Sequence, residues 1–212
     1  MYRLILGKIS TLILSSSELP SALMELAPDG TRRVSWLAGR ILLNSELSPL
    51  PEIINGKQGK PAFNTEAQLW FNLSHSGDDI ALLLSDEGEV GCDIEVVRPF
   101  NNWRALANDF FSLGELAEIE SEHPDRHMSA FWRIWTCKEA ILKQRGDSVW
   151  QIGSIDSTST PALMVNHCQI GSLSLAVCTP TAFILRDKDS YNGLYIYTSN
   201  NDPDFNFRTR MQ

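Results

Sequence analysis

The sequence predicts an α+β protein built from two related α/β lobes. A helix followed by strands occurs twice, roughly before and after residue 103. The apolar strand expected at 80–84 in the first half has a counterpart at 174–178 in the second half. At 212 residues the chain can bury a core large enough for one domain or two small ones. We therefore expect lobes over residues 1–103 and 104–199, followed by a loose polar tail over 200–212.

The first half is expected to alternate between strands and one long helix. Pro28, Asp29 and Gly30 form a turn pattern, and Thr31 is suited to cap the helix that follows. An Asp-Glu-Gly turn at 86–89 predicts a hairpin between the strands on either side of it. The expected elements are one or two strands in 2–14, a helix over 33–47, a long connection over 49–61, and strands over 69–73, 80–85 and 90–97.

The second half is expected to begin with helices and end with strands. Ser112 and Glu115 have the spacing of a helix capping box. Gly146 is placed to end the long helix that begins after Pro124. The expected elements are helices over 101–111, 112–122 and 126–145, and strands over 150–155, 163–168, 173–178, 183–185 and 194–198.

Composition and charge exclude several classes of protein. The net charge of −8 argues against a nucleic-acid-binding protein. No run of about 18 apolar residues is present, so we expect no membrane span, and the N-terminus lacks the features of a signal peptide. The four cysteines have neither C-x-x-C nor zinc-site spacing, which favours free thiols in a cytoplasmic protein.

Two carboxylates lie on one face of the strand expected at 90–97. Residues two apart share a face of a strand, so Gly91, Asp93 and Glu95 point away from the core that Cys92 and Ile94 enter. Neighbouring carboxylates repel each other unless a positive charge lies between them. The pair therefore suggests a cation site, although the polar side of an edge strand would have the same pattern.

The helix expected at 126–145 carries a third carboxylate. Trp135, Glu139 and Lys143 are four residues apart and so align along one side of the helix. An all-oxygen set of Asp93, Glu95 and Glu139 suits Mg²⁺, which usually completes its coordination with water and substrate phosphates. The alternative is a surface ion pair between Glu139 and Lys143, with Lys138 as an ordinary solvated lysine.

Two further segments have residues suited to phosphate. The loop at 56–61 combines glycines with Lys57 and Lys60, although it lacks the spacing of a Walker A loop. Ser74 and His75 lie at a strand end, where the imidazole could donate to a phosphate oxygen. Adjacent residues on an extended chain point apart, which argues against a Ser74–His75 nucleophilic pair.

Together these motifs resemble those of the 4′-phosphopantetheinyl transferases of the Sfp type. Over its length the chain is most similar to the AcpT-like holo-(acyl-carrier-protein) synthase 2 branch, and the resemblance covers residues 30–180. The motifs that carry it are, in chain order, Gly59-Lys60-Pro61, Phe71-Asn72-Leu73-Ser74-His75-Ser76-Gly77, Val90-Gly91-Cys92-Asp93-Ile94-Glu95, Phe110-Phe111-Ser112 with Glu115, and residues 131–143, which include Trp135-Thr136-Cys137-Lys138-Glu139.

The resemblance implies a fold and a reaction. The fold would be two lobes related by a pseudo-twofold axis, with the active site in the cleft between them. The reaction would move 4′-phosphopantetheine from coenzyme A to a serine of an apo acyl or peptidyl carrier protein and release 3′,5′-ADP. The enzyme would act as a monomer, without nucleic acid or membrane partners. A Mg²⁺-dependent phosphohydrolase and a non-catalytic module that binds coenzyme A or a carrier protein are the alternatives.

The resemblance also implies roles for single residues. Asp93, Glu95 and Glu139 would bind Mg²⁺ together with the pyrophosphate of coenzyme A, which Lys143 would contact. Glu139, or a water that it orients, would act as the base. The remaining contacts, to the 3′-phosphate and adenine, would come from Lys60, Ser74 and His75, with Arg33 or Arg40.

Overall fold

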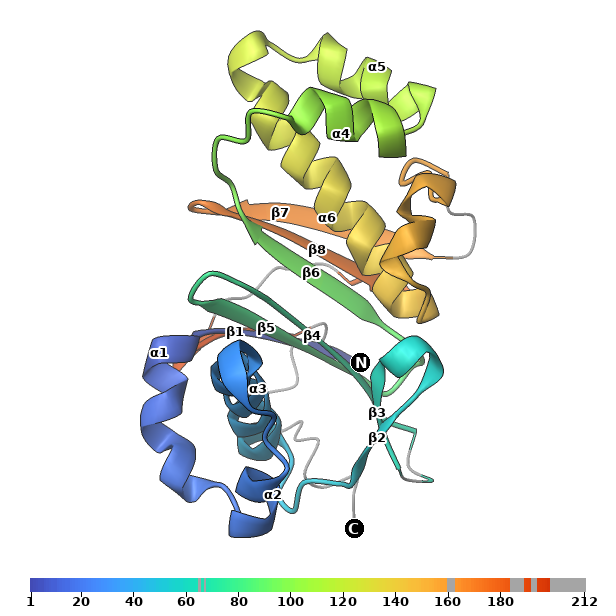
Figure 1. Cartoon of the computed structure of the whole chain (residues 1–212). Helices are drawn as coiled ribbons and strands as arrows, with labels where there is room; N and C mark the ends of the chain where they lie inside the picture. Colours follow the sequence, from blue (N-terminus) through green and yellow to red (C-terminus); the bar gives the residue numbers. More distant parts are fainter. Residues whose placement is uncertain (65, 67, 160–162, 184–188, 192–193, 199–212) are drawn as a thin grey trace.

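The computed structural model describes residues 1–64, 66, 68–159, 163–183, 189–191 and 194–198. They form a mixed α/β structure arranged in layers (Figure 1). Helices lie on the outside at both ends of the view, and two antiparallel sheets lie between them. No helix within these ranges combines the length and apolar character needed to cross a membrane.

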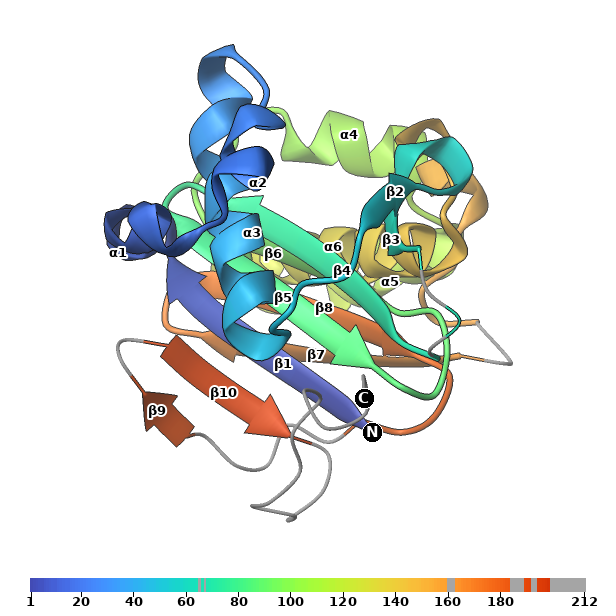
Figure 2. The ribbon, with the colours of Figure 1, turned by 90° about the horizontal axis from the view of Figure 1, so that it is seen from below.

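The larger sheet has five strands in the order β4-β5-β1-β10-β9. Strands β4 and β5 are joined by a two-residue hairpin turn, where Gly77 has a φ of 59°, a conformation that glycine adopts without strain. Figure 2 shows β9 and β10 next to β1, at the edge of the sheet away from β4. The strands are β1 (Tyr2–Lys8), β4 (Trp70–Ser76), β5 (Asp79–Ser85), β9 (Asp189–Tyr191) and β10 (Leu194–Thr198).

Helices α1 (Ile9–Leu12), α2 (Ser21–Glu25) and α3 (Arg33–Glu46) lie on one side of this sheet (Figure 1). The buried face of α3 packs with the inward residues of β1 and β5 in one apolar cluster. The predicted helix at 33–47 is confirmed, but its N-cap is Arg32 rather than Thr31. The predicted strand at 2–14 ends at Lys8, because Ile9 and Leu12 turn onto the cluster as one helical face.

The smaller sheet has three strands in the order β6-β8-β7, and α6 (His127–Arg145) lies across it. Helices α4 (Trp103–Phe110) and α5 (Leu113–Ser121) cover α6 from outside (Figure 1). The strands are β6 (Gly91–Val96), β7 (Met164–Ile170) and β8 (Leu173–Thr179). The capping box of Ser112 and Glu115 is confirmed, and so is the left-handed C-cap at Gly146. An apolar cluster between the sheets joins β1 and β5 to β6 and β8.

The hairpin predicted across the turn at 86–89 is wrong. Strand β6 leaves the sheet that contains β5 and pairs antiparallel with β8, from Gly91 opposite Cys178 to Val96 opposite Leu173. Cys92 and Ile94 still face inward, but they pack against the other sheet instead of extending it. The turn therefore carries the chain from one sheet to the other.

Two further segments differ from the prediction. Residues 150–155 do not form a strand, because Val149–Ser154 is a 3₁₀-helix with a capping box from Ser148 and Gln151. The connection at 49–61 contains a short antiparallel pair, β2 (Ile53–Asn55) with β3 (Pro61–Phe63).

The boundary at residue 103 stays a prediction, but it does not follow the sheets. Strand β10 pairs with β1, so a segment from the second half completes the larger sheet. Strand β6 from the first half belongs to the smaller sheet. The strand predicted at 183–185 lies outside the described residues except for Phe183, and the predicted tail at 200–212 lies wholly outside them.

Candidate functional site

The carboxylates of β6 point toward helix α6, which lies unusually close to this strand at Gly91. A Cβ atom on Gly91 would lie 2.0 Å from the carbonyl oxygen of Ala140 and 2.4 Å from the backbone nitrogen of Gln144. Glycine is therefore required for the helix backbone to approach the strand. This approach brings Glu139 and Lys143 on α6 to the strand that carries Asp93 and Glu95.

These side chains line one open pocket of about 310 Å³. It lies where β4, β6 and α6 meet, and six of the nine predicted site residues border it. Its lining residues are Leu73, Ser74, His75, Asp93, Glu95, Glu139 and Lys143. Three elements that are distant in sequence therefore bring the predicted metal ligands and the Ser74–His75 pair to one place.

Lys143 pairs with the strand and not with its own helix neighbour. Its Nζ donates to Oδ1 of Asp93 at 2.6 Å and to Oγ of Ser74 at 3.0 Å. Ser74 in turn donates to the same Asp93 oxygen at 2.8 Å. In the described part of the chain the ion-pair partner of Lys143 is Asp93, so a surface pair with Glu139 is not what forms.

The pocket shifts the protonation equilibria of its groups. Burial raises the pKa of Glu139, and the negative charge of Asp93 raises it further. Burial also raises the pKa of Glu95, against the hydrogen bond from Ser76. Burial opposes the charge of Lys143, but Asp93 outweighs it and holds the pKa of the ammonium above its ordinary value. The pKa of His75 is lowered by burial and by Lys143.

The donor atoms of the pocket fit a hard divalent cation. Asp93 is 4% exposed, and its Oδ2 is buried without a hydrogen-bond partner in the described structure. A buried unpaired carboxylate oxygen is costly and gains from a cation. The described His, Cys, Asp and Glu side chains nowhere gather in threes tightly enough to hold a metal by themselves. An ion at Asp93 would therefore share its coordination with water or with a ligand.

The other predicted phosphate contacts lie outside this pocket. Lys60 donates to Glu89 at 2.5 Å and to the carbonyl oxygens of Val90 at 3.0 Å and Gln144 at 3.3 Å, which uses all three ammonium hydrogens. Arg40 is buried with its guanidinium 4.5 Å from the ring centre of Trp36, and burial lowers its pKa. Arg33 donates to the carbonyl oxygen of Ala27 at 3.1 Å.

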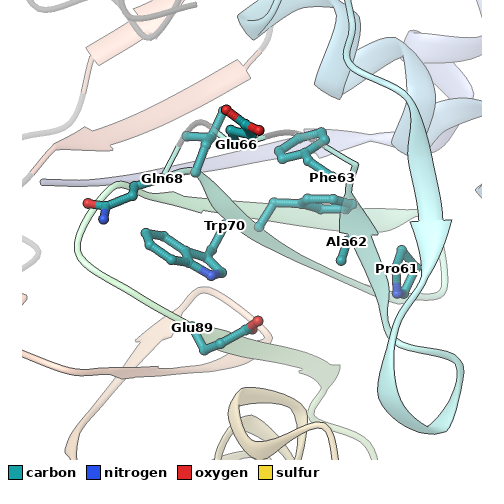
Figure 3. A pocket seen from close by; sticks show the side chains of 9 residues that line it. Pro61, Ala62, Phe63, Glu66, Gln68, Trp70 and Glu89 are labelled. Carbon is teal, nitrogen blue, oxygen red and sulfur yellow. The ribbon is translucent and has the colours of Figure 1, made fainter.

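A second pocket of about 320 Å³ lies beside the Lys60–Glu89 pair (Figure 3). Trp70 and Phe63 supply its aromatic surface, and the carboxylates of Glu66 and Glu89 border it. Figure 3 shows these two carboxylates on opposite sides of Trp70. Because carboxylates repel phosphate, this pocket does not suit the phosphate groups of a ligand.

Known proteins are similar to this chain over most of its length. Residues 89–182 match the model of the 4′-phosphopantetheinyl transferase superfamily. The chain is 67% identical over 185 residues to the 4′-phosphopantetheinyl transferase AcpT of Salmonella typhi, covering 87% of this chain and 95% of that protein. The chain belongs to the 4′-phosphopantetheinyl transferase superfamily. It is also 68% identical to AcpT of Escherichia coli K12 and 34% identical over 158 residues to HetI of Nostoc, covering 66% of HetI.

Membership of this superfamily makes the chain a transferase. The burial of Cys92 and Cys137 argues against either thiol as its nucleophile. Cys92, which neighbours Asp93, is buried, and burial raises its pKa to about 12. Burial likewise raises the pKa of Cys137 to about 12. Both are free cysteines, and burial favours the neutral thiol over the thiolate that attacks.

Sequence reasoning missed two transferase residues beside the carboxylates. Ser76 donates to Oε2 of Glu95 at 2.6 Å, and Asn72 accepts from the backbone N–H of Cys92 at 2.8 Å. Their signal was the alternation of Asn72, Ser74 and Ser76 along a strand otherwise rich in apolar residues. The alternation indicates contacts with the carboxylate strand only when β4 is known to lie beside β6.

Proposed function

We propose that the pocket at Asp93 is where this transferase moves 4′-phosphopantetheine from coenzyme A to a serine of an apo acyl or peptidyl carrier protein. The observation that carries the proposal is the convergence of Asp93, Glu95, Glu139 and Lys143 on one pocket. Three acidic groups with one partly buried lysine form a poor site for a neutral ligand. They form a suitable site for a pyrophosphate that arrives with a divalent cation.

The reaction exchanges one phosphorus–oxygen bond for another. The serine oxygen of the carrier bonds to the β-phosphorus of coenzyme A, and the bond from that phosphorus to the bridging oxygen of 3′,5′-ADP breaks. The serine proton passes to Glu139, or to a water that Glu139 orients. Glu139 supports this role because it lines the same pocket as Asp93 and Lys143.

Lys143 has the position and charge to act on the leaving group. Its pKa is raised, so the ammonium is charged at neutral pH and can offset charge on the pyrophosphate oxygens. Asp93, Glu95 and Glu139 would hold Mg²⁺, which supplies further positive charge to the same oxygens.

The 3′-phosphate and adenine would be held by Ser74 and His75 at the pocket, with Lys60, Arg33 and Arg40 as further contacts. His75 supports this role because it lines the pocket from β4. Lys60 lies near the end of α6, in contact with the carbonyl oxygen of Gln144. Each of these groups would exchange a present contact for a phosphate. For Arg40, burial of the guanidinium makes an anionic partner favourable.

The layers fit the arrangement that the motifs predict. Helix α3 over β1, β4 and β5 would form one lobe, and α6 over β6, β7 and β8 the other, with the pocket in the cleft between them. We propose that the enzyme works as a monomer in the cytoplasm, where its four free thiols would stay reduced.

The test incubates the protein with coenzyme A, Mg²⁺ and a panel of apo carrier proteins, and follows the intact mass of each carrier. A carrier heavier by one phosphopantetheine supports the proposal, and Glu139→Gln should abolish the gain. Release of phosphate or nucleotide without a carrier would instead indicate a phosphohydrolase. A protein that binds coenzyme A but modifies no carrier would overturn the proposal.

A further inference from the structure

Strands β4 and β6 lie side by side although they belong to different sheets. In this contact, side chains of β4 accept hydrogen bonds from backbone N–H groups of β6. The three hydrogen bonds run from Cys92 N to Asn72 Oδ1 at 2.8 Å, from Ile94 N to Ser74 Oγ at 3.3 Å, and from Val96 N to Ser76 Oγ at 3.1 Å. Every second residue of one strand therefore meets every second residue of the other.

These contacts satisfy an otherwise exposed edge. Strand β6 is at the end of the order β6-β8-β7, so alternate N–H groups point away from its sheet. Buried N–H groups need acceptors. Asn72, Ser74 and Ser76 supply them, and all three are less than 9% exposed.

The hydroxyl groups of Ser74 and Ser76 each form a second hydrogen bond, in which the hydroxyl is the donor. Ser74 donates to Oδ1 of Asp93 at 2.8 Å, and Ser76 donates to Oε2 of Glu95 at 2.6 Å. A hydroxyl has one hydrogen to donate, so accepting from the backbone fixes the direction in which that hydrogen points. Each carboxylate is thereby tied to the backbone of the residue that follows it on β6.

We infer that Ser76 is a positioning residue that holds the Glu95 carboxylate for the metal and pyrophosphate. The inference rests on the proposed function for the identity of the ligand. It gives roles to Ser76 and Asn72, which belong to the motif at 71–77 but had no role assigned from the sequence. Asn72 sets the alignment of the two strands, because it bonds to β6 without touching a carboxylate.

The experiment compares Ser76→Ala with Ser76→Thr, which keeps the hydroxyl. Mn²⁺ binding to the protein alone is measured by electron paramagnetic resonance, and the Mg²⁺ requirement is measured in the transferase assay. Ser76→Ala should weaken Mn²⁺ binding and raise the Mg²⁺ concentration for half-maximal rate by about 10–100-fold, the usual cost of losing a group that orients a metal ligand. Saturating Mg²⁺ should restore most of kcat, and Ser76→Thr should behave as wild type.

Ser121→Ala is the matched control, since Ser121 is exposed and its hydroxyl donates to the backbone carbonyl of Glu118. Unchanged Mn²⁺ affinity in a folded Ser76→Ala protein would overturn the inference. Hydrogen exchange of the wild-type protein tests it without any variant. The Ile94 and Val96 amides should be protected, and exchange at the rate of an exposed strand edge would also overturn it. Neither Mn²⁺ binding nor amide protection depends on transferase activity, so failure of the proposed function would be recognised separately.

Discussion

Lys138 and Glu115 form an ion pair in which neither side chain is exposed. The Nζ of Lys138 donates to Oε2 of Glu115 at 2.7 Å, and the exposed fraction of each side chain is 0%. Glu115 also accepts from the backbone N–H groups of Ser112 and Ser157, while Lys138 bonds to the carbonyl oxygen of Ile155. The pair therefore joins α5, α6 and the segment after α6 at the residue that precedes Glu139.

Breaking this pair should strongly destabilise the protein. Lys138→Met leaves the Glu115 carboxylate buried without its cation, which typically costs about 3–5 kcal/mol. Urea unfolding should show this loss, and adding Glu115→Gln should recover part of it. The control is Lys8→Met, because Lys8 is 53% exposed in its pair with Asp79. This variant should lower the free energy of unfolding by about 1 kcal/mol or less. Equal effects of the two lysine variants would contradict the buried-pair argument.

Adding one methyl group at Gly91 should displace α6 from β6. A Cβ at 2.0 Å from the Ala140 carbonyl oxygen cannot be accommodated without backbone movement. Gly91→Ala should lower stability by about 1–3 kcal/mol and reduce transferase activity more than stability alone explains. Gly114→Ala is the comparison, since its Cβ would meet only the Ser112 hydroxyl oxygen at 3.7 Å. Wild-type kinetics in Gly91→Ala would show that the close approach is not needed.

Lys143 should matter for turnover more than for binding. Lys143→Met removes the ammonium that neutralises Asp93 and would act on the pyrophosphate, so kcat should fall by about 100-fold or more. Steady-state kinetics with varied coenzyme A would separate kcat from KM. Arg145→Met, at an exposed position in the last turn of the same helix, should leave both constants unchanged. A Lys143→Met enzyme with normal kcat would refute the role assigned to this ammonium.

His167 should make stability depend on pH on the acidic side. Burial and the neighbouring Arg133 lower its pKa from 6.5 to about 4, and its Nε2 lies 2.9 Å from Oγ of Ser174. The unfolded chain therefore binds a proton below pH 6.5 that the folded protein does not bind until about pH 4. The contribution of neutral His167 to the free energy of unfolding is present above pH 6.5 and is lost as the pH falls toward 4. Because the ring is partly solvated, we expect a loss of at most about 2 kcal/mol.

The variant His167→Gln tests that dependence. A glutamine cannot be protonated in this range, so unfolding free energies measured between pH 4 and 6.5 should vary less with pH than in the wild type. His123→Gln is the control, since His123 is exposed. Identical pH profiles for wild type and His167→Gln would contradict the lowered pKa.

Local signals account for most of what the sequence predicted correctly. Ser112 with Glu115 and Gly146 mark helix ends through contacts within a few residues, so their helices were found. The partner of β6 could not be found this way, because Gly91 pairs with Cys178 far along the chain. The segment at 149–154 has apolar residues but leaves Trp150 86% exposed, which apolar character alone does not foresee.

In the predicted site too, local spacing identified residues correctly, whereas partners distant in sequence were missed. Spacing along one strand and one helix identified Asp93, Glu95, Glu139 and Lys143, and the structure brings all four to one pocket. The interpretation of Lys138 as a solvated lysine is wrong, because its partner lies on another helix. The arginines and Lys60 stay predictions, since their present contacts are with other parts of the protein.

The five-stranded and the three-stranded sheets each draw strands from both sides of residue 103, since β10 pairs with β1 and β6 pairs with β8. Cutting the chain there would leave β6 without its partner in one fragment and β10 without its partner in the other. Neither fragment should fold alone, but the two should reassemble when held together. The enzyme could therefore serve as a split reporter, in which recovery of carrier modification signals that two proteins fused to the halves have met.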